Sequence, residues 1–222
     1  MQTRLPAYGV VTGYSDDNFG GFKMKKRIAK GRRKTKETDI KWELNLNGKG
    51  TSKIKTGIPF LDHMLTLFAK HGLFDLKIEA KGDLEVDIHH TNEDLGICLG
   101  EAVKKALGDK KGIRRFATAF VPMDEALARV VLDISGRPSL NFGQADRSLS
   151  DKAVEGYTLR DAGHFLKSFC NESGINMHVE IQSGRDLHHM LEAVFKAFGK
   201  ALDEATQIDP RVKGIPSTKG RL

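Results

Sequence analysis

Histidine and glutamate recur in one five-residue pattern, His-His-x-x-Glu, at two places in this 222-residue chain. The pattern occupies residues 89–93 and again residues 188–192, an offset of 99 residues. Imidazole nitrogens and carboxylate oxygens are common ligands of divalent transition metals. A single such pattern on a helix is usually a solvated surface, but its recurrence at a long offset is hard to explain by packing. The repeat therefore indicates metal binding.

Each copy of the pattern opens a stretch whose apolar residues have helical spacing. On a helix, residues three or four apart share one side, whereas adjacent residues diverge by roughly 100° around the axis. We therefore expect one histidine and the glutamate of each copy to bind one ion, while the other histidine points towards a different ion. We therefore expect two metal sites, each with ligands from both copies of the pattern. The apolar positions are Leu95, Leu99, Val103 and Leu107 in the first stretch, and Leu191, Val194, Phe195, Phe198 and Leu202 in the second.

Two of the four remaining histidines also recur. His63 and His164 precede the two patterns by 26 and 24 residues, so both are candidate ligands. His71 follows His63 by eight residues, which places it about 80° further round a helix, where it can face the same cavity. We assign His71 to substrate contact, with a metal role as the alternative. His178 is expected in a strand with a structural role.

Composition narrows the class of protein. The chain has 39% hydrophobic and 29% charged residues, typical of a globular protein, and no apolar run approaches the roughly 20 residues of a membrane span. Its net charge of +7 favours anionic partners, either nucleic acid or small phosphorylated molecules. Cys98 and Cys170 lie in apolar surroundings and are expected to be buried, reduced thiols of a cytoplasmic protein. Import of a precursor into a plastid is the alternative that residues 1–31 leave open.

The pattern of elements predicts an α+β protein built from two similar halves. Residues 1–31 are glycine-rich and basic and are expected to form a flexible extension. Residues 32–112 and 113–209 each read as strand–strand–helix–strand–helix, and residues 210–222 form a tail. Helices covering one face of each sheet, packed between the two sheets, would bury both apolar stripes.

The individual elements follow from periodicity and turn residues. In the first half we expect a strand over 40–46, a return strand over 51–56, a helix over 57–72, a strand over 73–80 and the first patterned helix to Leu107. In the second half we expect strands over 113–121 and 126–134, a short strand over 139–142, a helix over 156–170, a strand over 175–181 and the second patterned helix to Ala205.

Several longer motifs resemble those of one known family, imidazoleglycerol-phosphate dehydratase, over about residues 32–222. The resembling segments are GIPFLDHMLTLFAKHG at 57–72, DIHHTNEDLG at 87–96, VPMDEAL at 121–127, SGRP at 135–138, HHMLEAVFKAF at 188–198 and PSTKG at 216–220. The resemblance implies a duplicated α+β fold, two Mn²⁺ ions per subunit and a 24-subunit particle with active sites between subunits. It also implies the dehydration of imidazoleglycerol phosphate to imidazoleacetol phosphate in histidine biosynthesis. Because residues 1–31 are too few for a further domain, we expect a monofunctional protein.

The resemblance also implies roles for individual residues. Glu37, His71, Glu93 and Glu192 would be catalytic, and His63 would also contact substrate. Zinc or iron would fit the same mixed donors as manganese. The implied metal ligands are His63, His89, His90, Glu93, His164, His188, His189 and Glu192.

Other roles concern the substrate. Glu37 matches a glutamate that contacts substrate, where a carboxylate suits proton transfer, although on its own it reads as a solvated residue in a charged run. Asp124 and Glu125 are candidates to orient metal-bound histidines, with a surface role equally plausible. The implied phosphate contacts are Arg115, Arg137, Lys196, Ser217, Thr218 and Lys219.

Two other classes of function compete with a metal-dependent lyase. A metal-storage protein of the di-iron type would carry Glu-x-x-His on four long helices, whereas here the order is reversed and helices alternate with strands. An RNA-binding module would suit the positive charge, but it gives the repeated histidines no purpose, and the chain lacks a cluster of aromatic residues for base stacking. We therefore expect a small phosphorylated imidazole as the partner, and neither nucleic acid nor membrane.

Overall fold

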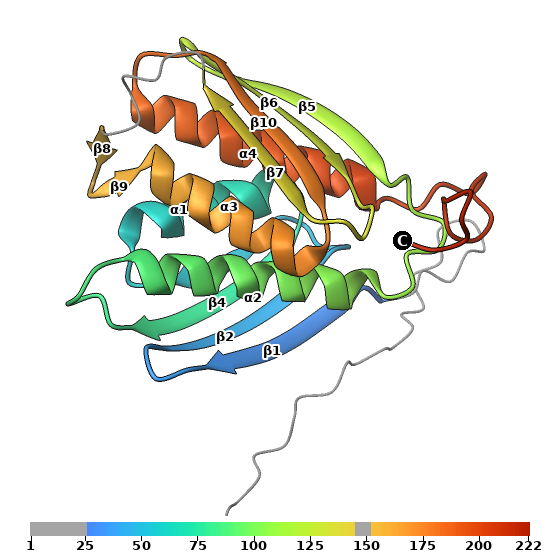
Figure 1. Cartoon of the computed structure of the whole chain (residues 1–222), viewed down its shortest axis with the longest axis horizontal. Coiled ribbons are helices and arrows are strands. Elements are labelled where there is room, and N and C mark those ends of the chain that lie inside the picture. Colours follow the sequence, from blue (N-terminus) through green and yellow to red (C-terminus); the bar gives the residue numbers. More distant parts are fainter. Residues whose placement is uncertain (1–25, 145–151) are drawn as a thin grey trace, which may run out of the picture.

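The computed structural model describes residues 26–144 and 152–222 as two four-stranded sheets with helices between them (Figure 1). The first half contributes β1 (Ile28–Lys34), β2 (Thr38–Asn45), β3 (Ser52–Lys55), α1 (Pro59–His71), β4 (Asp75–Gly82) and α2 (His89–Leu107). The second half contributes β5 (Phe116–Met123), β6 (Ala126–Asp133), β7 (Ser139–Gln144), β8 (Ala153–Val154), β9 (Tyr157–Thr158), α3 (Leu159–Ser173), β10 (Asn176–Ser183) and α4 (Leu187–Thr206).

The two sheets share one topology. Strand order is β1-β2-β4-β3 in the first sheet and β5-β6-β10-β7 in the second, so each strand has an equivalent in the other half. The third strand of each half, β3 or β7, pairs in parallel with the strand that follows its helix, and the other pairs are antiparallel. The predicted α+β fold from two duplicated halves, with helices packed between two sheets, is confirmed.

Alternating burial explains why these segments form half-buried strands. Along β2, Ile40, Trp42 and Leu44 are buried and face the helices, while the residues between them are partly or fully exposed. The period of two matches successive side chains on opposite faces of a strand. Strand β6 repeats the pattern with Ala128, Val130 and Leu132. Each sheet therefore offers one apolar face to the helical layer.

Three expectations about the order of elements were wrong. The first half has three strands before its first helix rather than two, and the second half has five, because the short strands β8 and β9 follow β5, β6 and β7. The segment after the 47–50 turn, β3, is not a return strand, because it pairs with β4 and not with β2. Strand β1 begins at Ile28, within the segment assigned to the extension. The sequence of β1 lacks the alternation of apolar and polar residues that indicates a strand, because only Ala29 is buried and a glycine, Gly31, lies against the ring of Trp42.

Helix α3 begins at Leu159, three residues later than expected from Gly156. The side chain of Thr158 accepts a hydrogen bond from the backbone N–H of Asp161, and the Asp161 carboxylate accepts from the Thr158 N–H in return. This reciprocal capping box fixes the first turn of the helix. Residues 157–158 before it form β9, paired with β8.

The helices pack across the boundary between the halves. Helix α1 of the first half contacts α4 of the second, and α3 of the second half contacts α2 of the first. Glycines permit these close approaches: a Cβ on Gly199 of α4 would lie 2.4 Å from the carbonyl oxygen of Phe68 in α1. A Cβ on Gly96 of α2 would lie equally close to the carbonyl of Phe165 in α3. Each patterned helix is thus paired with a helix from the other half.

Aromatic rings fill the centre of the helical layer. The ring of Phe198 on α4 lies 4.6 Å from that of Phe68 on α1 and 4.9 Å from that of Phe169 on α3, measured between centroids. All three side chains are fully buried. Such clusters contribute much of the apolar surface that stabilises a core. The shared core makes the two halves one packed unit. Among the described residues, no helix has both the length and the apolar character needed to cross a bilayer.

Candidate metal centres

Two histidine–glutamate clusters lie where the predicted ligands were expected to meet. The first consists of His89 and Glu93 on α2 with His164 on α3. Nδ1 of His164 lies 3.3 Å from Nδ1 of His89, and Nε2 of His89 lies 3.5 Å from Oε1 of Glu93. One ligand atom from each residue falls within 4.8 Å of the others. The three donors can therefore share a single ion.

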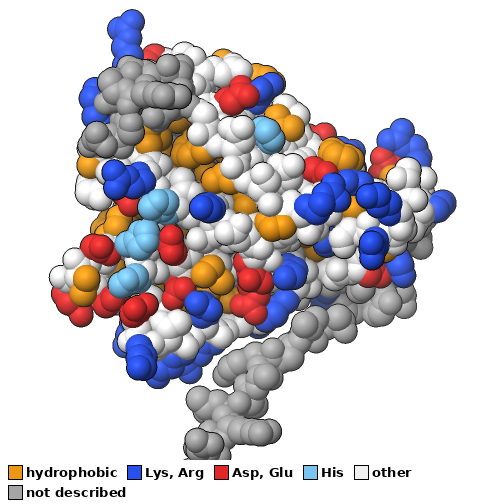
Figure 2. Space-filling view, viewed as in Figure 1, with side chains coloured by type: hydrophobic (Ala, Val, Ile, Leu, Met, Phe, Trp, Pro, Cys, Tyr) orange, Lys and Arg blue, Asp and Glu red, His pale blue; other side chains and the backbone are white. Residues whose placement is uncertain are grey.

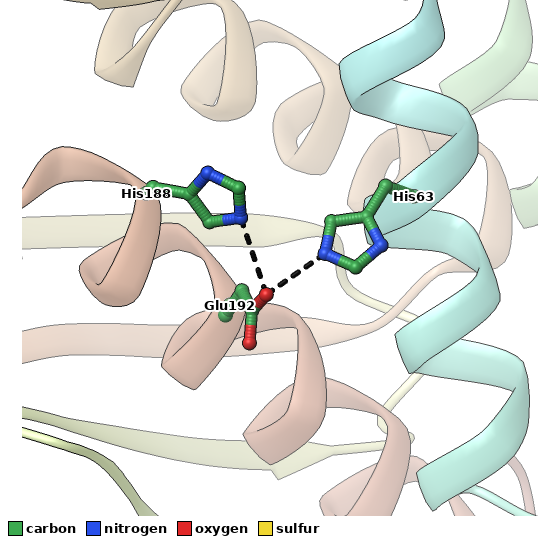
Figure 3. A group of neighbouring side chains, drawn as sticks. All are labelled: His63, His188 and Glu192. Atoms are coloured by element: carbon green, nitrogen blue, oxygen red, sulfur yellow. Dashed lines mark hydrogen bonds and ion pairs between the residues drawn. The ribbon is translucent and has the colours of Figure 1, made fainter.

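The second cluster consists of His63 on α1 with His188 and Glu192 on α4 (Figure 3). Oε1 of Glu192 lies 2.8 Å from Nε2 of His63 and 3.2 Å from Nε2 of His188. Both rings point towards the same carboxylate oxygen. The helical spacing of four between His188 and Glu192 brings them together, as it does for His89 and Glu93.

Each cluster combines ligands from both halves of the chain. His63 belongs to the first half but completes the second motif, and His164 belongs to the second half but completes the first. The cause is the exchange of helix partners, since α1 packs on α4 and α3 packs on α2. The side chain of Asp186 caps α4 by accepting a hydrogen bond of 2.7 Å from the backbone N–H of His188. The side chain of Asp87, one residue before the N-cap of α2, accepts a bond of the same length from the N–H of His89.

The other histidine of each motif lies outside these clusters, as the divergence of adjacent helical residues predicts. Nδ1 of His90 lies 2.9 Å from Oδ2 of Asp83, and Nδ1 of His189 lies 2.8 Å from Oε2 of Glu125. These hydrogen bonds are the first cause of a raised pKa for both imidazoles. Because a carboxylate holds Nδ1 of each ring, Nε2 is the nitrogen that could bind a metal ion outside the two clusters of the chain.

Glu125 is itself held firmly. Its Oε1 accepts backbone hydrogen bonds from Asp186 at 2.9 Å and from Arg185 at 3.1 Å, while Oε2 faces His189. The Asp186 N–H, then His189 and Arg185, lower the pKa of Glu125 to about 2. The role in orienting a histidine that the sequence suggested for Glu125 therefore has a geometric basis. Asp124 lies further from His189, at 3.7 Å from Nε2.

A lysine joins the second cluster. Nζ of Lys196, one helical turn after Glu192, lies 2.6 Å from Oε2 of Glu192. Burial would raise the pKa of Glu192, but hydrogen bonds from Lys196 and His63 outweigh it and hold that pKa at about 2. Glu192 is thus a fixed anion whose two oxygens face different partners: Oε1 the histidines, and Oε2 the ammonium.

The donor set fits a divalent transition metal. Each cluster supplies two imidazole nitrogens and one carboxylate oxygen, a combination suited to manganese, iron or zinc. Three protein donors leave coordination positions for a further protein ligand or a substrate atom. Six of the eight predicted ligands therefore form two clusters of three, and His90 and His189 belong to neither.

Two predicted substrate contacts lie beside the clusters rather than within them. Glu37 is exposed in the turn between β1 and β2, and its charge is the second cause, after Asp83, of the raised pKa of His90. His71 ends α1 and is exposed. Its pKa is lowered by partial burial, then by the charges of Lys196 and Lys200, while Glu192 of the second cluster acts in the opposite direction. His178 lies in β10 as expected, exposed on the outer face of its sheet.

The predicted phosphate contacts do not gather at the clusters, with Lys196 as the exception. Arg115 precedes β5, where its guanidinium binds Asp133 at 2.7 Å and donates to the Pro216 carbonyl at 2.8 Å. Leu222 lies against Gly136, beside Arg137. Arg115, the turn at 135–137 and the tail that contains Ser217, Thr218 and Lys219 therefore form one group near the C-terminus (Figure 1).

This basic group and the clusters occupy opposite ends of the molecule. Helix α2 carries His89 at its first residue and ends at Leu107 on the side of the tail, about 27 Å away at the usual rise per residue. Figure 2 shows several histidine side chains beside acidic ones at one end and a concentration of Lys and Arg side chains at the other, although Lys and Arg also occur near the histidines. One chain therefore cannot bring its own tail to its own clusters in this arrangement.

Sequence reasoning missed two partners in the site. Asp83 was given no role from the sequence, yet Asp83 contacts His90 from seven residues upstream. The ion pair between Lys196 and Glu192 was also overlooked, although its i,i+4 spacing was a usable signal.

Fold and site define a class: an internally duplicated α+β protein with two histidine–glutamate clusters suited to divalent metal. A family model for imidazoleglycerol-phosphate dehydratase matches residues 56–202. The enzyme of that name from Thermoanaerobacter pseudethanolicus is 59% identical over 196 residues, covering 88% of this chain and all of the relative. The one from Bacillus subtilis is 57% identical over 190 residues, covering 86% and 96%.

Solved structures agree. Imidazoleglycerol-phosphate dehydratase from Pyrococcus furiosus matches with a TM-score of 0.73 and 40% identity, covering 86% of this chain and 99% of that one. The Staphylococcus aureus enzyme matches with a TM-score of 0.72 and 37% identity, covering 82% and 99%. The chain therefore belongs to the imidazoleglycerol-phosphate dehydratase family and is a hydro-lyase of histidine biosynthesis.

Proposed function

We propose that the chain dehydrates imidazoleglycerol phosphate to imidazoleacetol phosphate with two divalent metal ions per subunit, Mn²⁺ being the ion we expect. The observation that carries this proposal is the pair of clusters, each with two imidazoles and one carboxylate. A bound divalent ion would supply Lewis acidity, which stabilises negative charge on the imidazole ring of the substrate. Membership of the dehydratase family supplies the substrate.

The chain's own residues would handle the proton and the phosphate. Glu37 lies beside His90 on an exposed turn, where a carboxylate can accept a proton from the substrate carbon. His71, whose pKa is lowered first by burial, would be neutral at neutral pH and able to accept or donate a hydrogen bond. Arg115, Arg137 and the hydroxyls of Ser217 and Thr218 beside Lys219 suit phosphate oxygens.

We further propose that active sites form between subunits of a metal-assembled particle, with 24 subunits as the resemblance implies. Two observations support this arrangement. The basic residues proposed to bind phosphate and the metal clusters lie at opposite ends of one chain, so each active site would combine clusters of one subunit with basic residues of a neighbour. His90 and His189 also lie outside their own clusters, and their Nδ1 atoms contact Asp83 and Glu125, which leaves Nε2 of each ring for a neighbour's metal.

The state of the two thiols supports the proposed compartment. Cys98 and Cys170 are free and buried, and burial raises the pKa of each to about 12. Unreactive reduced thiols suit a reducing compartment, which supports a cytoplasmic protein.

A reconstitution experiment tests the proposed function. The purified chain is stripped of metal, supplied with Mn²⁺, Zn²⁺ or Mg²⁺, and assayed for imidazoleacetol phosphate formed from imidazoleglycerol phosphate. We expect no turnover without metal and the highest turnover with Mn²⁺. Full turnover by the stripped protein would contradict a metal-dependent reaction.

Metal content should fall as the pH drops from about 8 to about 5, because protons compete with metal for imidazole nitrogen. His90 and His189 have pKa values above their ordinary value of 6.5, so their protonation begins early in this range. Glu192, with a pKa of about 2, stays ionised throughout. Dialysis at each pH followed by elemental analysis measures the loss, and circular dichroism confirms an intact fold. Constant metal content would refute histidine ligation.

Deletion of residues 215–222 should raise KM by about 10- to 100-fold while leaving metal content unchanged. The tail carries hydroxyls and an ammonium suited to phosphate, and each charge-assisted hydrogen bond contributes about 1.5–3 kcal/mol. Steady-state kinetics measure the change, and deletion of Arg221 and Leu222 alone is the control that keeps Ser217 to Lys219. An unchanged KM for the longer deletion would assign phosphate binding to residues outside the tail.

A further inference from the structure

The internal duplication makes the two candidate metal sites directly comparable, residue by residue. On α2 the sequence places His89, Glu93 and Ile97 at successive turns of one helix face, and on α4 the equivalents are His188, Glu192 and Lys196. At the first two of these three positions, both helices carry the same residue types, histidine and then glutamate. The third is an apolar side chain in one half and an ammonium in the other.

This single difference changes the surroundings of the metal-binding carboxylate. Lys196 Nζ lies 2.6 Å from Glu192 Oε2 and 3.2 Å from Met123 Sδ. The Lys196 and Glu192 side chains are only 13% and 10% exposed. The Glu93 side chain is 42% exposed, and its Oε1 lies 3.5 Å from Nε2 of His89.

More positive charge surrounds the second site on the same side. Lys200 lies one turn beyond Lys196 on α4. Both lysines act on His71 at the end of α1, where they lower its pKa after the larger effect of burial. The helix that carries the glutamate of the second site therefore also carries two lysines after it.

We propose that the two metal sites have different affinities, the site of His63, His188 and Glu192 being the weaker because Lys196 occupies the second oxygen of its carboxylate. This inference rests on the proposed binding of two metal ions. The first site, of His89, Glu93 and His164, fills first, and the second fills only at a higher metal concentration.

Electrostatics gives the direction of the effect. An ammonium on Oε2 repels a dication on Oε1 of the same carboxylate, and little water screens charges as enclosed as these. The hydrogen bond also withdraws electron density from the ligand and makes it a weaker donor. Glutamate is ionised at neutral pH without help, so the ammonium offers no gain in ionisation that would offset the repulsion.

Titration of the metal-free full-length chain with Mn²⁺, with free ion followed by electron paramagnetic resonance, measures both sites without any activity assay. We expect two classes of one ion per chain that differ by about 10-fold or more in Kd, the usual scale for groups that contact metal ligands. His63→Ala should remove the weak class and His164→Ala the tight one. This pair of variants assigns each class to its cluster.

Substitutions at the differing position then test the cause. Lys196→Met, which keeps the length of the side chain, should tighten the weak class about 10-fold, whereas Lys196→Arg, which keeps the charge, should leave it weak. Ile97→Lys should weaken the tight class. Two equal classes in the unmodified chain, or no tightening in Lys196→Met, would overturn the inference. Fewer than two bound ions would instead refute the proposed two-metal function.

Discussion

His164→Ala is expected to remove one metal ion per chain and to lower kcat by more than about 100-fold, although His164 lies far in sequence from the motif that it completes. Its ring contacts His89 at 3.3 Å, and the loss leaves only His89 and Glu93 at the first cluster. His63→Ala should do the same at the second cluster, where Nε2 of His63 contacts Glu192 at 2.8 Å. Elemental analysis and single-turnover kinetics measure the two effects.

His178→Ala is the matched control for these variants. His178 is also a histidine of the second half, but it is exposed on the outer face of its sheet, on β10, outside both clusters. The His178→Ala variant should keep both metal ions and normal turnover. If His164→Ala and His178→Ala retained equal metal, the composite first cluster would not be a metal site.

Glu37→Gln is expected to lower kcat by about 100-fold or more with metal content unchanged, the usual scale for loss of an acid–base group. Glu37 lies in the turn between β1 and β2, close enough to His90 for its charge to raise the pKa of that imidazole. Glutamine keeps the shape of the side chain and removes its ability to carry a proton. Since Glu37 lies outside both clusters, both sites should still fill.

Glu79→Gln provides the comparison, because Glu79 is an exposed carboxylate on the outer face of β4, outside both clusters. Its turnover should be unchanged. Near-normal turnover of Glu37→Gln would mean that Glu37 is only a solvated residue of a charged turn. A proton acceptor would then have to be sought elsewhere, with His71 as the next candidate.

Local patterns in the sequence were sufficient to predict the helices that carry the motifs. The helix expected over 57–72 corresponds to α1, where Leu61, Met64, Leu65 and Phe68 have helical spacing and are fully buried. The two histidine–glutamate motifs likewise placed His89 with Glu93 and His188 with Glu192, because i,i+4 spacing fixes neighbours on a helix. These features depend only on residues close together in the chain.

Features that depend on distant contacts could not be predicted in the same way. Strand β1 has little alternation and exists because it pairs along its whole length with β2. Strand β3 pairs with β4 across an intervening helix, a choice that turn residues at 47–50 do not reveal. The exchange of histidines between halves depends on helix packing at Gly96 and Gly199, where backbone carbonyls of the partner helices lie close.

The substrate side of the site was the least predictable. Arg115 was assigned to phosphate as one residue among several, but the structure shows it bound to Asp133 and to the carbonyl of Pro216. Its distance from the clusters becomes visible only when α2 is placed in three dimensions. A sequence gives the type of a residue, whereas the end of the molecule that it occupies depends on the topology of the whole fold.

X-ray diffraction from crystals grown with Mn²⁺, with anomalous data recorded at the manganese absorption edge, tests the central claim most directly. We predict two anomalous peaks per chain, one among His89, Glu93 and His164 and the other among His63, His188 and Glu192. We further predict that each peak has an imidazole of a neighbouring subunit's His90 or His189 in its coordination sphere. A single peak per chain, or peaks away from both clusters, would contradict the account.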